Sequence, residues 1–195
     1  MKHTETPRFA FLAALMTMLF VGTSVFGQTY TLDNTKSELT IFGTSNIHDW
    51  EITVEQQEGK ITFNAGETPT VTGMEISIPV ESLKSGKSGM DKNTYKAMDT
   101  KKHKLVTFTQ TGDATLTAAG ENTWKVKAKG DLTISGVTKA SELEFTLKVA
   151  NGSLMLNGEK SIDMTAFNVE PPTALLGTIT TGKDVTLKFN TVLSK

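Results

Sequence analysis

The chain has 195 residues, of which 37% are hydrophobic, and it contains no cysteine. This length fits one domain that can bury its own core, and the absence of thiols excludes disulfides, thiolate metal sites and a lipidated N-terminal cysteine. The net charge of −1 argues against nucleic acid as a partner.

The first 27 residues have the pattern of a secretory signal peptide. Lys2 and Arg8 precede an apolar run over residues 9–21, and the small residues 22–24 follow, with Val25 and Gly27 at the minus-three and minus-one positions of the expected cleavage site. The run is shorter than the roughly 18 apolar residues that cross a bilayer, which disfavours an uncleaved anchor. We therefore expect cleavage after Gly27, a single domain over residues 28–195, a periplasmic or secreted location and no stable membrane insertion.

Most of the remaining chain alternates between apolar and polar residues, which is typical of strands with one buried face. In chain order the expected strands cover residues 39–42, 50–54, 60–63, 74–80, 105–109, 124–134, 143–149, 154–156, 161–164 and 185–192. Glycine-containing turns are expected between them at residues 58–59, 111–113, 119–121, 135–136, 151–152, 157–158 and 182–183. Short strands with such turns indicate an antiparallel meander, sandwich or barrel.

Two segments break the strand pattern. Residues 89–98 place apolar side chains, among them Met90 and Met98, at helical spacing, which predicts a short helix within a long connection over residues 83–104. Residues 168–173 contain two prolines and favour neither a helix nor a ladder of strand hydrogen bonds. Long excursions of this kind often gate a ligand site in a small β-protein.

The interior of a closed barrel of about eight strands holds either packed side chains or one small ligand. Five methionines follow the leader: Met74, Met90, Met98, Met155 and Met164. Unbranched thioethers line adaptable apolar surfaces, which favours a ligand cavity, although they also fill gaps in a solid core. The sequence pattern leaves both interiors open.

The candidate ligand-binding residues are apolar and aromatic side chains from the inward strand faces and the helix, together with His48, which shares strand parity with Trp50. They are His48, Trp50, Ile52, Met74, Ile76, Ile78, Met90, Tyr95, Met98, Phe108, Trp124, Val126, Leu132, Phe145 and Leu147. His48 either hydrogen-bonds a ligand headgroup or fixes the neighbouring turn.

Lysines concentrate in the long connection. Residues 84–104 contain seven lysines against two aspartates. Lys92, Lys96 and Lys101 of this cluster are candidates for a basic headgroup rim that attracts a phosphate or carboxylate. The alternative interpretation is a solvated loop whose lysines keep the protein soluble.

Catalytic and metal chemistry is difficult to build from this sequence. His48 and His103 are the two histidines after the leader, and two histidines without cysteine do not make a typical zinc site. Residues 85–88 superficially match a phosphate-binding loop, but Glu81 occupies the position of its first glycine. A Gly-x-Ser-x-Gly nucleophile motif is absent. We expect no metal, no cofactor and no enzymatic activity.

Several segments resemble the YceI-like proteins. They are residues 43–50, 78–86, 90–93, 130–138 and 170–173, and the Leu-Thr-Ile-x-Gly-Val-Thr segment from Leu132 is the most specific. The resemblance covers nearly the whole mature chain. It implies a lipocalin-like eight-stranded antiparallel barrel, a lengthwise apolar pocket, export to the periplasm and, in some members, binding of polyisoprenoid or other amphiphilic lipids. Residues 92–98 lack the aromatic Asp-Phe-Phe-Asp type signature of the better-known branch.

These observations together predict an all-β, antiparallel eight-stranded lipocalin-like barrel with one short helix in a long connection. The predicted function is to hold a polyisoprenoid or fatty-acid-like amphiphile as a carrier, store or scavenger. The alternatives are a structural or adhesive β-sandwich with a filled core and no ligand, and an enzyme that acts on an isoprenoid or peptide. A homodimer is compatible with the sequence.

Overall fold

The structure is a computed structural model that describes residues 27–195, so the predicted signal peptide, apart from Gly27, lies outside the described residues. The strands are β1 (Gln28–Leu32), β2 (Glu38–Ser45), β3 (Trp50–Val54), β4 (Glu58–Asn64), β5 (Thr70–Pro79), β6 (Leu83–Lys84), β7 (Leu105–Gln110), β8 (Thr115–Gly120), β9 (Thr123–Ile134), β10 (Val137–Ala150), β11 (Ser153–Asp163), β12 (Thr173–Ala174) and β13 (Ile179–Ser194). The helices are α1 (Ser88–Ala97) and the 3₁₀ segments η1 (Asn34–Lys36), η2 (Val80–Ser82), η3 (Met164–Phe167) and η4 (Leu175–Gly177).

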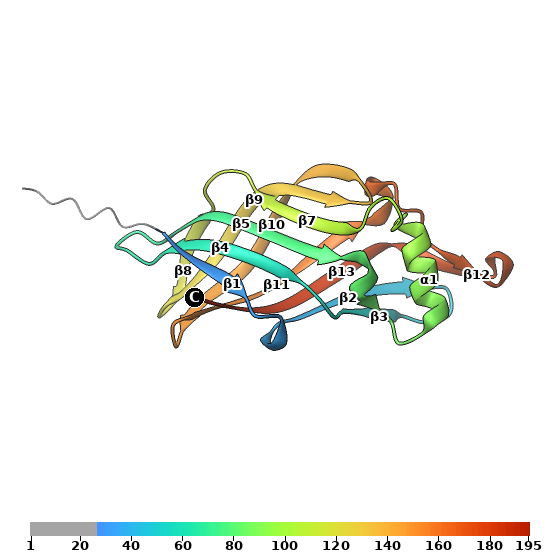
Figure 1. Ribbon diagram of the computed structural model, residues 1–195, viewed down its shortest axis with the longest axis horizontal. Helices are drawn as coiled ribbons and strands as arrows, with labels where there is room; N and C mark the ends of the chain where they lie inside the picture. The colour runs from blue at the N-terminus through green and yellow to red at the C-terminus, as the bar shows by residue number, and fades with distance from the viewer. Residues whose placement is uncertain (1–26) are drawn as a thin grey trace, which may run out of the picture.

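The strands close into an antiparallel barrel of eight ribbons, which Figure 1 shows from the side. Four ribbons consist of two strands each, β1 with β2, β3 with β4, β5 with β6 and β7 with β8, and the other four are β9, β10, β11 and β13. The barrel closes because β1 and β2 both pair with β13. The predicted eight-stranded antiparallel barrel with one short helix is confirmed.

Two of the expected turns form tight hairpins. Ser135 and Gly136 have φ values of 48° and 76°, and Asn151 and Gly152 have values of 51° and 76°. Two consecutive left-handed residues match the right-handed twist of the flanking strands, and glycine and asparagine tolerate this conformation. These hairpins join β9 to β10 and β10 to β11.

Three of the expected turns were wrong, because residues 58–59, 157–158 and 182–183 lie inside β4, β11 and β13. The glycine of the second pair serves close packing instead of chain reversal. A Cβ at Gly158 would lie 2.5 Å from the Phe189 ring. The expected strands over residues 154–156 and 161–164 are therefore parts of the single strand β11.

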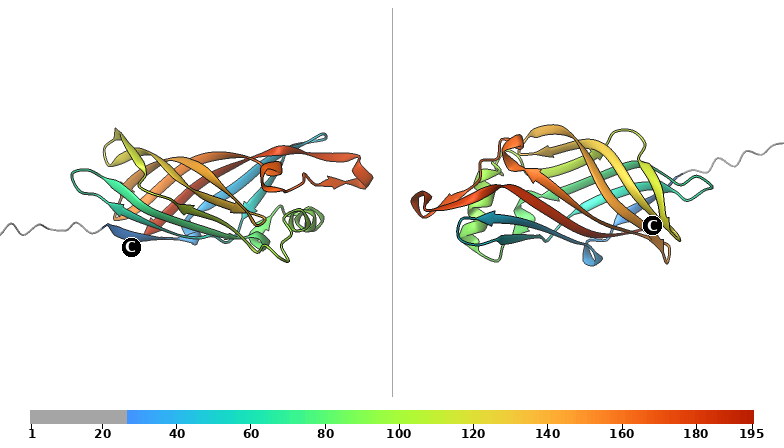
Figure 2. Two further views of the ribbon diagram at one scale, coloured as in Figure 1. Left: turned by 90° about the horizontal axis from the view of Figure 1, so that it is seen from above. Right: turned by 180° about the vertical axis from the view of Figure 1, so that it is seen from behind.

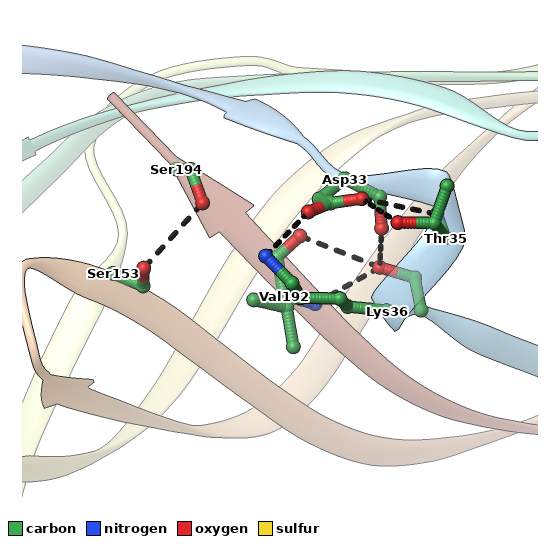
Figure 3. Close-up of polar contacts among 7 residues, drawn as sticks. Asp33, Thr35, Lys36, Ser153, Val192 and Ser194 are labelled. Atoms are coloured by element: carbon green, nitrogen blue, oxygen red, sulfur yellow. Dashed lines mark hydrogen bonds and ion pairs between the residues drawn. The ribbon is translucent and has the colours of Figure 1, made fainter.

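The first two ribbons are interrupted side by side, and polar side chains bridge the interruption. Asp33 caps η1 by accepting hydrogen bonds from the Thr35 amide at 3.0 Å and its hydroxyl at 2.6 Å, and its own amide donates to the Val192 carbonyl at 2.9 Å (Figure 3). Asn34 donates to the Glu55 carbonyl of the next ribbon at 2.9 Å. The interruption between β1 and β2 is thereby hydrogen-bonded to both neighbouring ribbons, β13 on one side and the ribbon of β3 and β4 on the other.

One half of the barrel is filled with side chains. The most deeply buried residues of this half include Phe63, Val71, Val126, Leu147 and Leu154, each at most 1% exposed. Phe63 packs against Trp124 with ring centroids 5.7 Å apart. The helix α1 and strand β12 lie at the opposite end of the barrel (Figure 1).

Gly158→Ala is expected to lower the free energy of unfolding by about 1–3 kcal/mol, because overpacking displaces the neighbouring backbone. The new Cβ would lie 2.5 Å from Phe189 Cζ and 2.7 Å from the Glu144 carbonyl oxygen. Gly73→Ala is the matched control, since its Cβ would meet only Thr62 Oγ1, at 3.9 Å. Urea unfolding followed by tryptophan fluorescence measures both variants. Equal losses would contradict the packing role assigned to Gly158.

Candidate functional site

An apolar cavity of about 650 Å³ occupies the barrel end beneath α1. We call it the outer chamber. This volume falls within the range of roughly 300–1,000 Å³ that is common for small-molecule pockets. Most of the strand residues that line it are aliphatic or aromatic: Leu39, Ile41, Trp50, Ile52, Val54, Ile78, Leu83, Val106, Leu132, Ile134, Ile162, Ala174, Ile179, Val185 and Leu187.

A second cavity of about 100 Å³ lies deeper in the barrel, and we call it the inner chamber. It borders on the outer chamber because the two share six lining residues: Leu39, Ile78, Val106, Leu132, Ile162 and Leu187. Phe189 lines the inner chamber and packs edge-to-face on Phe145, with centroids 6.5 Å apart. Phe145 belongs to the packed core, so the inner chamber is bounded at this pair by buried side chains.

The helix α1 covers the outer chamber with one side and is anchored by the other. Met90, Ala97 and Met98 line the chamber. The Tyr95 hydroxyl instead accepts a hydrogen bond from Lys84 Nζ at 2.8 Å and lies 2.9 and 3.0 Å from the Glu81 and Leu83 carbonyl oxygens.

The start of α1 is held by a carboxylate. Asp91 accepts hydrogen bonds from the Ser85 hydroxyl at 2.6 Å and the Ser85 amide at 2.8 Å. These bonds hold the pKa of Asp91 below its ordinary value, because they favour the charged carboxylate. The helix is thus fixed to its preceding loop by polar contacts, and its cavity side presents Met90 and Ala97 together with the polar residues Lys92, Asn93 and Thr94.

The segment after β11 forms a second cover, to which Met164, Phe167 and Val169 contribute lining side chains. Asp163 caps η3, and its carboxylate accepts hydrogen bonds from Lys183 Nζ at 2.7 Å and from Thr165. The Lys183 contact is the main cause that lowers the pKa of Asp163 to about 2. The cap therefore stays charged well into the acidic range.

The barrel wall has a gap beside the inner chamber. β10 and β11 pair only as far as Phe145 and Gly158. Beyond that point, residues 137–144 pair with β9 and residues 159–163 pair with β13. The two strands diverge there, and side chains instead of backbone hydrogen bonds close the wall.

A few polar groups face the inner chamber. Lys160 lines it and spans the wall gap, where its Nζ donates to the Glu142 carbonyl at 2.9 Å. Gln57 is 4% exposed, and its Nε2 has no hydrogen-bond partner among the described residues. Thr191 is also buried. An unpaired buried amide is costly, so Gln57 is a ready donor to a ligand oxygen at this depth.

The structure places ten of the predicted ligand-binding residues on the cavity. His48, Trp50, Ile52, Ile78, Met90, Met98 and Leu132 line the outer chamber, and Met74, Ile76 and Phe108 line the inner chamber together with Ile78 and Leu132. The remaining five lie outside the lining: Tyr95, Trp124, Val126, Phe145 and Leu147. Trp124, Val126, Phe145 and Leu147 belong to the packed core of the filled half. Tyr95 hydrogen-bonds with Lys84.

His48 lies before β3 instead of within it, so strand parity does not determine its direction. The residue is exposed, and its Nδ1 lies 2.8 Å from the Asp49 carbonyl oxygen. Its amide donates to the Ser45 hydroxyl, which in turn donates to the His48 carbonyl. His48 therefore belongs to a turn at the edge of the outer chamber.

The three lysines of the predicted headgroup rim are all exposed, but they do not act together. Lys92 lines the outer chamber, whereas Lys96 and Lys101 do not. Lys87, which the sequence analysis did not single out, also lines it. The basic edge of the cavity is therefore formed by Lys87 and Lys92.

Sequence reasoning missed most of the wall. Leu39, Ile41, Ile162, Val185 and Leu187 lie in expected strands, and strand parity would have identified them. Phe167 and Val169 lie in an irregular segment that carries no such signal.

Within residues 27–195 no group of three histidine or acidic side chains is arranged to hold a metal ion. No helix of that region is long and apolar enough to cross a membrane.

Three solved structures share this architecture. Burkholderia cenocepacia BcnA is 20% identical with a TM-score of 0.67, over 83% of this chain and 98% of that chain. A polyisoprenoid binding domain from Saccharophagus degradans, implicated in plant cell wall breakdown, is 17% identical with a TM-score of 0.68, over 85% and 97%. A Campylobacter jejuni YceI protein is 19% identical with a TM-score of 0.56, over 73% and 83%. These likenesses show the fold.

Comparison with curated protein sequences gives no significant match. The family model of the YceI-like domain matches residues 30–193, which includes every ribbon of the barrel, both chambers and the two covers. The match thus extends over nearly all of the described residues, and the chain belongs to the YceI-like family.

Proposed function

We propose that this protein binds a lipid or isoprenoid-like amphiphile in its barrel and acts as an exported carrier, store or scavenger. The observation that carries the proposal is the contiguous pair of chambers, an apolar space of about 650 Å³ and a deeper one of about 100 Å³. The similar domain from Saccharophagus degradans is described as polyisoprenoid-binding, which supports the same class of ligand.

The lining favours an elongated apolar ligand over a polar substrate. Burial of one methylene group contributes roughly 0.8 kcal/mol, so a chain of about 15 carbons offers on the order of 12 kcal/mol before the costs of ordering and association. A lipid therefore needs little polar help to bind. The exposed turn that holds His48 offers no nucleophile paired with a base, and this supports binding instead of catalysis.

The polar groups are distributed so that both ends of an amphiphile can be satisfied. Lys87 and Lys92 lie at the edge of the outer chamber, where they suit a carboxylate or phosphate headgroup. Gln57 and Lys160 lie at the inner chamber. We propose that the anionic headgroup stays at the lysine edge, because an ion is solvated there at little cost.

Ile78→Trp is expected to reduce ligand uptake at least about tenfold, because Ile78 lines both chambers and the larger ring occupies space at their junction. Ser77→Trp is the matched control, since it adds the same ring to the neighbouring residue of β5, outside the cavity lining. Titration with a fluorescent fatty acid, and mass spectrometry of lipid extracted from the freshly purified proteins, measure the effect. A wild type that carries no lipid and takes up no fatty acid would refute the proposed function.

Lys87→Ser combined with Lys92→Ser is expected to weaken binding of a fatty acid several-fold more than binding of the matching fatty alcohol. Only the fatty acid carries a charge for these ammonium groups to attract. Lys96→Ser combined with Lys101→Ser removes the same charge from outside the lining, and we expect a smaller effect. Equal losses for acid and alcohol would eliminate the electrostatic role of the edge.

Export follows from the leader and is part of the proposal. Expression of the full chain in a Gram-negative host is expected to yield a periplasmic protein that begins at Gln28. Intact mass measurement of the periplasmic fraction reads the cleavage site directly. Recovery of the uncleaved chain from the cytosol or the membrane fraction would contradict export.

A further inference from the structure

Two exposed leucines form the tip of a hairpin beyond the barrel. The side chain of Leu175 is 71% exposed, and that of Leu176 is fully exposed. They lie in η4, between β12 and β13, and this hairpin projects past α1 at the end of the barrel (Figures 1 and 2). Their φ values of 49° and 54° are left-handed, a conformation that leucine rarely adopts. Strained residues of this kind cluster at functional sites.

The base of this hairpin is part of the cavity wall. Thr173, Ala174 and Ile179 line the outer chamber, whereas Leu175 and Leu176 do not. The two leucines therefore contribute nothing to the cavity surface and lie directly beyond its edge.

A third apolar side chain is fixed beside the hairpin. Ile47 is 57% exposed and lies next to Asn46, whose Nδ2 donates to the Thr178 carbonyl at 2.9 Å. The Thr180 amide donates to Asn46 Oδ1 at 3.0 Å. The loop between β2 and β3 is thus tied to the hairpin, and it adds Ile47 to the apolar surface at this end.

Exposed lysines gather on the α1 side of the same end of the barrel. Lys87, Lys92, Lys96, Lys101 and Lys104 are exposed on α1 and its flanking loops, and none forms an ion pair within residues 27–195. Asp99 is paired with Lys102 and Asp91 accepts from Ser85, while Asp49 and Glu170 are exposed near the hairpin, so the five lysines still outnumber the unpaired carboxylates at this end. Exposed leucines next to unpaired lysines match an interfacial membrane contact, in which apolar groups enter the acyl boundary and cations meet anionic headgroups.

We propose that Leu175, Leu176 and Ile47 dock this end of the barrel onto an anionic phospholipid surface. The inference rests on the proposed function, since docking would place the cavity edge against the bilayer and let an apolar ligand pass without crossing water. A second copy of the chain fits the tip less well, because contact between two such ends would bring two lysine clusters together.

Sedimentation with phosphatidylcholine vesicles that contain one-quarter phosphatidylglycerol tests the docking. Leu175→Ser combined with Leu176→Ser is expected to lower the vesicle partition coefficient at least about tenfold, because two apolar side chains no longer enter the membrane. Phe42→Ser is the control, since Phe42 is a 36% exposed aromatic on β2, outside the cavity lining and away from the hairpin. Binding should weaken with added salt and on vesicles of phosphatidylcholine alone.

Ligand binding in solution separates this inference from the proposed function. The Leu175 and Leu176 double variant should bind a water-soluble fluorescent fatty acid with unchanged affinity but should extract it from vesicles more slowly. A wild type that binds the fatty acid and ignores both kinds of vesicle would overturn the docking and leave the carrier function in place. A wild-type dimer that the double substitution converts to a monomer, with no vesicle binding, would reassign the tip to self-association.

Discussion

Closure of the barrel along β13 is the constraint on which the rest of the structure depends. One edge of this strand pairs with β11, and the other edge pairs with β2 and then with β1. The last strand of the barrel is thus hydrogen-bonded to the first ribbon. Closure pairs most of the sheet edges and leaves unpaired the stretch where β10 and β11 diverge. It also turns every inward side chain toward a common axis, and the interior space exists only because these inward faces meet around it.

The size of the inward side chains decides where that interior is solid. Tyr30, Phe63 and Phe145 are buried in one half, and Trp124 packs against Phe63. The other half is lined mainly by aliphatic residues, and its end is covered by α1 and η3 instead of being plugged by side chains. The anchors of these covers, Tyr95 and Asp163, bind on the outside and leave apolar groups facing inward. One fold thereby combines a stabilising core with an unfilled chamber.

The architecture could be predicted from the sequence because alternation, hairpin chemistry and helical spacing are local properties. Ser135-Gly136 and Asn151-Gly152 formed the expected turns, whereas Gly158 lies within a strand because Phe189 packs over it, a contact made by a distant residue. The short strands β1 and β8 were missed, since most of their residues are exposed. Alternation along a strand predicts which face of the sheet a side chain lies on, but not its position along the barrel axis. Val126 and Leu147 do point inward, but they lie in the filled half.

The two ends of the barrel need different side chains, and different parts of the sequence supply them. The filled end needs large side chains packed at high density, where a lost methylene costs stability. The cavity end exposes apolar surface both inward, in the chamber, and outward, at Leu175 and Leu176. Apolar groups that add nothing to the core lower solubility unless they contact something. A lipid inside the chamber and a lipid surface beyond it would account for both kinds of exposure with one chemistry, because each removes from water apolar area that the fold leaves open.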